Sequence, residues 1–309
     1  MLEVTDLRKT YGERPVLDGV QLTVGAGQIM GLLGANGAGK TTLISIIAGL
    51  RGADSGSVRV AGLDALRQPR RAARHIGLAP QELGLYPMLT VAQNLAFFAR
   101  LAGLRGGGRR RRVAEIAAAL DLADQLGRCA GELSGGQQRR LHTAMAVLHR
   151  TDVLFLDEPT VGADVRSRAG ILDVVRAMAA EGTAIVYTTH NLMELEQLGA
   201  DIAVLHAGRI AVEGHLDDVV NRYATASVGL RFDGAVPALP GWHADGSRLT
   251  PDLPVTDPAA AAARALAALD PNQAACLTGV DVTHPSLETA YLAITGQPRT
   301  SENHHALVA

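Results

Sequence analysis

The chain has 309 residues, of which 47% are hydrophobic and 19% are charged, and its formal net charge at pH 7 is −2. This length and hydrophobic content predict one large or two modest domains with a buried core. The near-balanced charge argues against a protein that wraps nucleic acid, and no apolar run approaches the ~20 residues of a membrane-spanning helix.

Alternating apolar residues at 1–8 and 16–24 predict two strands, and the apolar run 28–34 predicts a buried strand that leads into a helix over 40–50. We expect further strands at 55–62, at the end of 70–81, and at 152–160, 183–189 and 201–206, and helices at 90–104, 109–126, within 131–150, 165–181 and 191–198. A basic loop, LRGGGRRRR at 104–112, is expected between the first two of these helices. Strands that alternate with helices predict an α/β fold with a largely parallel sheet.

The composition changes after about residue 222, where proline and aspartate become frequent, as in PALPGW and TPDLPVTDP. Strand-like patterns at 226–233 and 274–283 and helical patterns at 257–269 and 285–295 predict a small α+β unit. Residues 297–309 are expected to be a disordered tail. The chain is therefore expected to contain a large α/β part and a smaller second domain.

Two cysteines, Cys129 and Cys276, lie far apart and show no metal-ligand spacing, which is typical of a protein from a reducing cytoplasm. The first residues, MLEVTDLRKTYG, are charged from the third position and contain no apolar stretch, so we expect no secretory signal peptide. Any role at a membrane would then depend on a partner.

The segment GLLGANGAGKTT contains the pattern G-x-x-x-x-G-K-[ST] after a predicted strand and at the start of a predicted helix. Glycines allow the backbone N–H groups to face a triphosphate, and the helix N-terminus adds partial positive charge. A lysine in this position reaches the β and γ phosphates, and the next hydroxyl ligates Mg²⁺. The alternative is a simple glycine-rich turn. The candidate nucleotide-binding residues here are Gly34, Asn36, Gly37, Gly39, Lys40, Thr41 and Thr42, with Thr41 also a metal ligand and Lys40 also catalytic.

The run VLFLDEP predicts a strand in the interior of the sheet that ends in two acidic residues. Ligands bind at the carboxyl ends of strands in such sheets, so Asp157 and Glu158 are expected beside the phosphates. Asp157 is the candidate metal ligand, and Glu158 is the candidate catalytic residue that orients or deprotonates the attacking water. The alternative is that these acids only cap the strand end.

The segment LSGGQQRR resembles the signature motif of ABC ATPases, and it lies before a predicted helix, 19 residues upstream of LDEP. The candidate nucleotide-binding residues of this motif are Ser134, Gly135, Gly136 and Gln137. A second glycine-rich helix N-terminus is a second phosphate site, although the same residues also fit an ordinary helix cap and turn. In the family, the signature of one subunit faces the phosphate loop of its partner.

Four further residues resemble family positions in the expected order. Tyr11 matches the aromatic residue that stacks on adenine, and Gln81 matches the glutamine that contacts Mg²⁺ or the attacking water. Asp164 matches an aspartate at the dimer interface, and His190 matches the histidine that contacts the γ-phosphate. Each has a plain alternative: a half-buried strand-end tyrosine, a loop glutamine, a helix N-cap and a structural histidine. We assign Gln81 and His190 as catalytic candidates.

The resemblance covers residues 1 to about 215 and implies a P-loop NTPase fold with a helical subdomain and an antiparallel β subdomain. It assigns residues 1–222 to an ABC nucleotide-binding domain and 223–296 to a small C-terminal domain. One cassette without an inserted coiled coil favours a transport subunit. The segments EPTVGADVRSR and PSLETAYLAITG resemble the daunorubicin/doxorubicin-type exporters.

The resemblance also implies the cofactors and partners. It predicts an ATPase that uses ATP and Mg²⁺, forms a head-to-tail homodimer and powers a separate membrane permease on the cytoplasmic face of a bacterial membrane, without a nucleic-acid partner. An importer subunit and an ATP-dependent regulator of a soluble partner are the alternatives. The basic segment at 104–112 is expected to be a solvated surface, with contact to anionic lipid as the lesser alternative.

Overall fold

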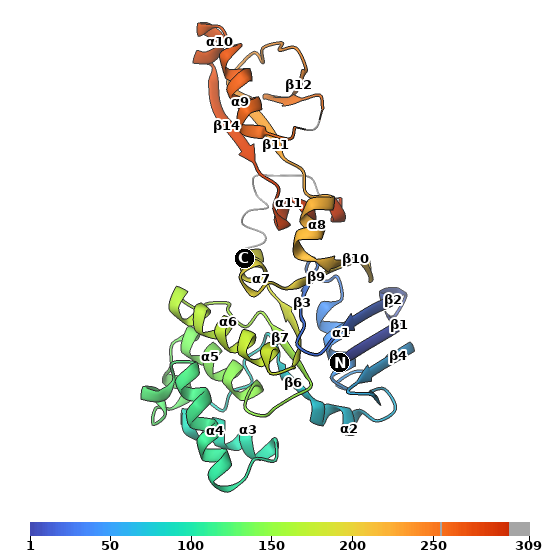
Figure 1. Cartoon of the computed structure of the whole chain (residues 1–309), viewed down its shortest axis with the longest axis vertical. Helices are drawn as coiled ribbons and strands as arrows, with labels where there is room; N and C mark the ends of the chain where they lie inside the picture. The colour runs from blue at the N-terminus through green and yellow to red at the C-terminus, as the bar shows by residue number, and fades with distance from the viewer. Residues whose placement is uncertain (254, 297–309) are drawn as a thin grey trace. The chain divides into compact units, whose positions relative to one another are not determined.

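The computed structural model describes residues 1–253 and 255–296 of the chain (Figure 1). The expected disordered tail at 297–309 lies outside the described residues. The chain divides into two compact units, of which one contains Met1–Leu216 and the other begins at Asp217. Among the described residues, no helix combines the length and apolar character that crossing a membrane requires.

A six-stranded sheet is the centre of the first unit, with the strand order β10-β9-β3-β8-β7-β6. All neighbouring strands are parallel except the last hairpin, in which β10 runs antiparallel to β9. The predicted α/β fold is therefore confirmed. Its continuous apolar runs, such as IMGLL and AIVYT, are fully buried, as expected for parallel strands covered on both faces. The strands are β3 Ile29–Leu33, β6 Ile76–Ala79, β7 Val153–Asp157, β8 Ala184–Thr188, β9 Asp201–His206 and β10 Arg209–His215.

The strand order brings distant segments together. β8 lies between β3 and β7, so the strand before the phosphate loop and the strand that ends in Asp157 both neighbour it. Asp157 pairs with Thr188 at the carboxyl ends of β7 and β8. The loops after β3, β7 and β8 therefore leave the same edge of the sheet, where ligands bind in this kind of fold.

A smaller antiparallel sheet, with the order β2-β1-β4-β5, forms the β subdomain. Its first hairpin is longer than predicted, because β1 continues to Tyr11 and β2 begins at Arg14, with these two residues paired across the turn. The strand pattern did not predict this extension, because residues 8–11 are polar and both faces of the hairpin end are open to solvent. The strands are β1 Leu2–Tyr11, β2 Arg14–Val24, β4 Ser55–Val60 and β5 Leu63–Asp64. Their apolar face shares one core with helix α1, Lys40–Ile47.

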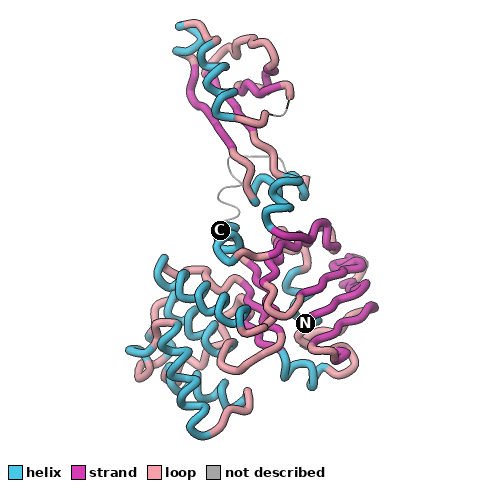
Figure 2. Tube along the Cα trace, in the orientation of Figure 1, coloured by secondary structure: helices cyan, strands magenta, loops and turns pink. Residues whose placement is uncertain are grey.

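Helices cover the larger sheet and form the helical subdomain. In Figure 2, helices α3 to α6 gather on one side of the first unit and the smaller sheet lies on the other. α3 packs against α4 and α5, and α5 packs against β6 and α6. The helices are α2 Pro69–Ala72, α3 Val91–Leu101, α4 Gly106–Ala119, α5 Gly135–Ala146, α6 Val165–Ala180 and α7 Leu192–Leu198.

The predicted loop at 104–112 is wrong over most of its length. Helix α4 begins at Gly106 rather than at 109, so the glycine run lies within the helix together with the arginines, and the helix ends at Ala119 rather than at 126. Arginine has a high helix propensity, which offsets the cost of glycines in the first turn. Tertiary contacts add to this, since Arg112 donates to Leu148 O and Val147 O at 3.0 Å each, at the end of α5.

The second unit is a small α+β arrangement, as predicted, with a four-stranded antiparallel sheet in the order β12-β13-β11-β14. Helix α9, Pro258–Ala267, packs on β11 and β14 and shares their core through Ala265. The strands are β11 Ser227–Phe232, β12 Trp242–Asp245, β13 Arg248–Pro251 and β14 Leu277–Thr283, and the other helices are α8 Leu216–Tyr223, α10 Pro271–Ala275 and α11 Leu287–Thr295.

Two features of this unit differ from the prediction. The hairpin of β12 and β13 was missed, although its two-residue turn, Gly246–Ser247, has glycine at the first position, which is a known hairpin signal. The strand expected over 274–283 begins later, because Pro271–Ala275 is helical. There, Asp270 and Gln273 form a capping box that spans Pro271 in the first turn, and this stabilises a helix start.

Candidate nucleotide-binding site

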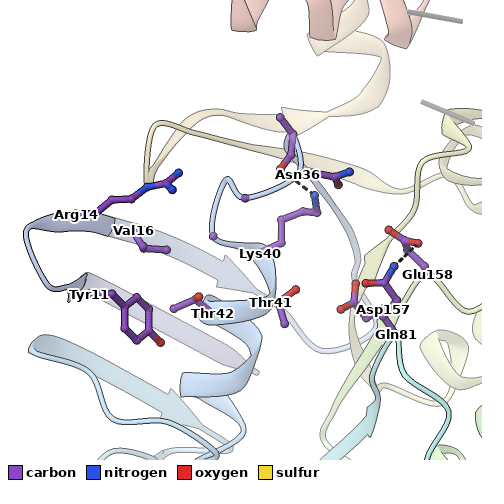
Figure 3. A pocket seen from close by; sticks show the side chains of 13 residues that line it. Tyr11, Arg14, Val16, Asn36, Lys40, Thr41, Thr42, Gln81, Asp157 and Glu158 are labelled. Atoms are coloured by element: carbon purple, nitrogen blue, oxygen red, sulfur yellow. Dashed lines mark hydrogen bonds between the residues drawn. The ribbon is translucent and has the colours of Figure 1, made fainter. Parts of the chain in front are cut away.

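A pocket of about 360 Å³ lies where the phosphate loop, the end of β7 and the first hairpin meet (Figure 3). Three walls can be followed in Figure 3: the hairpin residues, the loop with the start of α1, and the acidic residues with Gln81. The lining residues are Tyr11, Arg14, Val16, Ala35, Asn36, Gly37, Gly39, Lys40, Thr41, Thr42, Gln81, Asp157 and Glu158.

The start of α1 is open. Its N-cap residue is Gly39, at φ 110°, and no side chain caps the helix. A Cβ atom at this position would lie 2.9 Å from Val16 O, so glycine is required by both backbone conformation and space. A Cβ at Gly34 would lie 2.6 Å from Leu205 O. The backbone N–H groups at an uncapped helix start favour an anion.

Lys40 brings the positive charge to this loop. Its ammonium group donates to Gly34 O and lies 3.4 Å from Ala35 O, so it bridges the loop. Burial lowers the pKa of Lys40, and the carboxylates of Asp157 and Glu158 act in the opposite direction. A phosphate in the pocket would be a further favourable partner for this half-desolvated cation.

Asp157 is held in place at the end of β7. The hydroxyl of Thr188, on the neighbouring strand, donates to Asp157 Oδ1, and both residues are buried. Thr41 and Asp157 line the same pocket and supply hydroxyl and carboxylate oxygens. Oxygen ligands of this kind, few in number and beside a phosphate site, fit Mg²⁺, which keeps waters and substrate phosphates as its other ligands.

Glu158 has a constrained backbone and a fully engaged side chain. Its φ is 52°, and its N–H group faces Thr188 O and Thr188 Oγ1 at 3.1 Å each. His190 Nε2 lies 2.6 Å from Glu158 Oε1, and Gln81 Nε2 donates to Glu158 Oε2 at 3.2 Å. The structure thus brings together Glu158, His190 and Gln81, which are far apart in the sequence. Strained backbone of this kind is typical of functional sites.

The backbone at Gln81 is tied to the signature helix. Arg139, on α5, donates to Gln81 O at 2.7 Å and is almost fully buried. Burial lowers the pKa of Arg139, and Glu158 and Asp157 oppose this shift. Sequence reasoning missed this residue, because its partner is a backbone carbonyl 58 positions away.

The signature residues do not line this pocket. Ser134 is the N-cap of α5, where its hydroxyl accepts from Gln137 N at 3.3 Å and Gln137 Oε1 accepts from Ser134 N at 3.0 Å. Asp164 caps α6 and accepts from Ser167 N at 2.7 Å. Both capping alternatives therefore hold within one chain, and the exposed Ser134 and Asp164 lie outside the pocket.

The hairpin wall combines an aromatic ring, a cation and an aliphatic side chain. Tyr11 is 41% exposed, and Arg51 Nη1 donates to its hydroxyl at 2.9 Å. Arg14 lies opposite Tyr11 in the ladder, and Val16 follows two residues later on the same face of β2. Arg14, Val16 and Ala35 were not predicted. The period-two pattern of β2 could have indicated the first two, had the strand start been placed correctly.

In this chain, a phosphate loop opens a helix after a central parallel strand, and it lies beside the acidic end of a nearby strand. This combination defines a P-loop nucleotide-binding ATPase. The sequence model of the ABC transporter family matches residues 17–161. The chain belongs to the ABC transporter family and contains its ATPase domain.

Relatives of this chain include ATP-binding proteins that are named for drug resistance. The chain is 37% identical to the daunorubicin resistance ATP-binding protein DrrA3 of Streptomyces coeruleorubidus, over 96% of each protein. It is 44% identical to the daunorubicin resistance ATP-binding protein DrrA2 of the same organism, over 70% of this chain and 67% of that protein. The structure resembles that of a dimeric ATP-binding cassette in a post-hydrolysis state with ADP and Pi, with a TM-score of 0.65 and 26% identity over 70% of this chain and 99% of the other.

Proposed function

We propose that two copies of this chain bind and hydrolyse ATP at shared sites and thereby power a separately encoded permease that exports a drug, a lipid or another hydrophobic compound. The observation that carries this proposal is the division of the predicted site. Residues of the phosphate loop line one pocket together with Gln81 and Glu158, and His190 pairs with Glu158. Ser134, Gly135, Gly136 and Gln137 lie outside this pocket. A second copy supplies the missing half in a head-to-tail dimer.

Each residue then has a role in the shared site. Tyr11 stacks on adenine, the phosphate loop with Lys40 binds the β and γ phosphates, and Glu158 orients the attacking water together with His190. Thr41, Asp157 and Gln81 would hold Mg²⁺, whose charge would neutralise the phosphate oxygens. Catalysis would come from positioning and electrostatics, with the water facing Glu158 as the nucleophile. The signature and Asp164 of the partner subunit close the site.

A mixing experiment tests the shared site. Lys40→Ala removes the loop cation and Ser134→Arg blocks the signature, so homodimers of either variant contain two defective sites. A mixed dimer contains one intact site, because the intact loop of one chain meets the intact signature of the other. We expect neither variant alone to hydrolyse ATP and the mixture to recover part of the parent turnover. No recovery in mixtures that form heterodimers would contradict the arrangement in trans.

A second variant tests the dimer directly. Glu158→Gln keeps the size of the side chain and removes the carboxylate that faces the water, so ATP binds but is hydrolysed poorly. We expect this variant to accumulate as a dimer with MgATP in size-exclusion chromatography with light scattering. Ser134→Arg in the same background should remain monomeric. Full activity of Glu158→Gln would exclude Glu158 from catalysis.

Transport requires a membrane partner. The similarity to daunorubicin resistance proteins supports a place on the cytoplasmic face of a bacterial membrane, and residues 69–104, which flank Gln81, are the proposed contact with the permease. The test is co-purification with the permease, followed by ATP-dependent uptake of daunorubicin into inside-out vesicles. Dependence on an external binding protein would instead indicate an importer, and activity with a soluble partner alone would indicate a regulator.

A further inference from the structure

A buried carboxylate lies behind the site, outside the pocket. Glu194, on α7, is 1% exposed, and its two oxygens accept hydrogen bonds from three hydroxyl groups. Thr160 Oγ1 lies 2.8 and 2.9 Å from the two oxygens, and Tyr187 OH and Thr189 Oγ1 lie 2.8 and 2.9 Å from Glu194 Oε2. Arg168 Nε forms an ion pair with Glu194 Oε1 at 3.3 Å, without hydrogen-bond geometry.

The donors come from segments that carry candidate site residues. Thr160 lies two positions after Glu158 and four before Asp164, in the loop that joins β7 to α6. Thr189 directly precedes His190, and its hydroxyl also accepts from Asn191 N at 2.9 Å. One carboxylate therefore contacts both loops whose side chains meet at the 2.6 Å pair of His190 and Glu158.

The third hydroxyl comes from a different environment. Tyr187 lies within β8, a fully buried strand in the middle of the sheet, and it precedes neither loop directly. Burial raises the pKa of the Tyr187 phenol well above its ordinary value, with the Glu194 charge acting in the same direction, so the phenol donates as a neutral group. Tyr187 thus anchors Glu194 to the sheet, while Thr160 and Thr189 attach the two loops to it.

The energetic cost of burying the Glu194 carboxylate favours a single arrangement of the two loops. A buried carboxylate is costly unless several donors satisfy it, and removal of one donor from such a network leaves the charge less compensated. A displacement of either loop would break a hydrogen bond to Glu194. The two loops are therefore held in register with each other through the carboxylate that both threonines share.

We infer that Glu194 is a positioning residue for ATP hydrolysis: it fixes the loop of Glu158 and the segment of His190 relative to each other and does not touch the nucleotide. This inference rests on the proposed function of the site. It implies that Glu194 controls turnover, because a misplacement of about 1 Å between catalytic groups costs up to about a hundredfold in rate. Nucleotide affinity, which depends on the hairpin wall and the phosphate loop, is independent of it.

Three hydroxyl deletions distinguish positioning from general stability, since each removes one donor from the same carboxylate. Thr160→Val and Thr189→Val release a loop, whereas Tyr187→Phe removes a donor that belongs to neither loop and leaves both threonine hydrogen bonds to Glu194 in place. We expect each threonine variant to lower kcat about three- to tenfold at unchanged KM for ATP, and Tyr187→Phe to change kcat less than about twofold. Thr160→Val is the cleaner loop variant, because Thr189 also accepts from Asn191 N.

Glu194→Gln keeps the size of the side chain and removes its charge. We expect kcat to fall by about tenfold or more, with the affinity for a fluorescent ATP analogue within about twofold of the parent. If Glu194→Gln does not fold, as judged by circular dichroism and thermal melting, the hydroxyl series decides the question.

The inference fails if folded Glu194→Gln retains full turnover, or if Tyr187→Phe lowers kcat as much as Thr160→Val. Equal losses of affinity and turnover in the threonine variants would also overturn it. The parent protein separates these outcomes from failure of the proposed function: a parent that does not hydrolyse ATP refutes the function, whereas an active parent without the expected pattern refutes only the role of Glu194.

Discussion

Two helices in this protein begin in glycine-rich segments, and their N-termini differ. α1 begins after Gly39 with no side-chain cap, so its first N–H groups face the pocket together with Lys40. α5 begins at Gly135 with a complete capping box, in which Ser134 and Gln137 satisfy each other's backbone N–H groups. The first N-terminus is open and positively charged, and the second is closed by its own side chains.

This difference indicates what each N-terminus does before a nucleotide arrives. An uncapped helix start with a nearby cation binds an anion without rearrangement. A capped start is already stable, and its Ser134 hydroxyl is exposed for an additional acceptor. Under the proposed function, binding by one subunit depends on α1, and α5 contributes to a nucleotide that a second subunit presents.

The largest expected effect comes from removal of the cation at the open N-terminus. Lys40→Ala should lower ATP turnover by about a hundredfold to a thousandfold, because an electrostatic contact to the reacting phosphate is lost. Steady-state phosphate release measures this. Unchanged turnover would contradict the assignment of the phosphate loop and remove the contrast between the two helices.

A matched pair of glycine substitutions sharpens the contrast. Gly39→Ala forces alanine into a left-handed conformation, which costs about 1–2 kcal/mol, and it places a methyl group 2.9 Å from Val16 O. We expect nucleotide affinity to fall at least tenfold, by about 1.4 kcal/mol. Gly135→Ala meets open space, with no atom within 4 Å. It should leave nucleotide binding by the single subunit unchanged in a fluorescence titration. Equal losses of affinity in the two variants would show that the two helix N-termini do not differ in nucleotide binding.

Helix α5, whose N-terminus is capped, also predicts a pH dependence of stability. His142, on the buried face of α5, is 4% exposed, and burial with the nearby Arg139 charge lowers its pKa from 6.5 to about 4. The unfolded chain then binds a proton that the folded chain excludes, so stability is lost as pH falls from about 6.5 to about 4. The free energy of unfolding should drop by about 2 kcal/mol between pH 7 and pH 5 from this residue alone.

Chemical denaturation at both pH values measures this difference. His142→Gln should reduce the pH dependence by that amount, whereas His206→Gln, at an exposed position of the same protein, should retain it. An equal pH dependence in the parent and His142→Gln would place the acid sensitivity elsewhere in the protein.

The smallest effect concerns the cap itself. Ser134→Ala removes one side-chain acceptor from the start of α5 and should lower the free energy of unfolding by about 1 kcal/mol. ATP binding by the isolated subunit should not change, because Ser134 lies outside the pocket. Urea denaturation and a nucleotide titration test both expectations, and a loss of affinity in the monomer would show that the two helix starts act on one nucleotide within a single chain.

Much of the site was predictable because its parts are local. The phosphate loop and the acids after VLFL are contiguous patterns with a fixed relation to the neighbouring strand and helix, and Gly39, Lys40, Asp157 and Glu158 line one pocket. The helix predicted from 109 begins at Gly106 instead, because the local glycine signals favoured a loop and gave no information about the contacts of Arg112 with Val147 and Leu148.

The amino-acid sequence by itself determined the α/β class, the elements that carry each motif and the chemistry that each motif can offer, since these depend on periodicity and on neighbours along the chain. Only the tertiary structure decided which motifs meet. It placed β8 between β3 and β7, brought His190 and Gln81 to the same carboxylate, and connected both loops to the buried Glu194. These contacts depend on strand order and packing, which bring together residues that no local pattern relates.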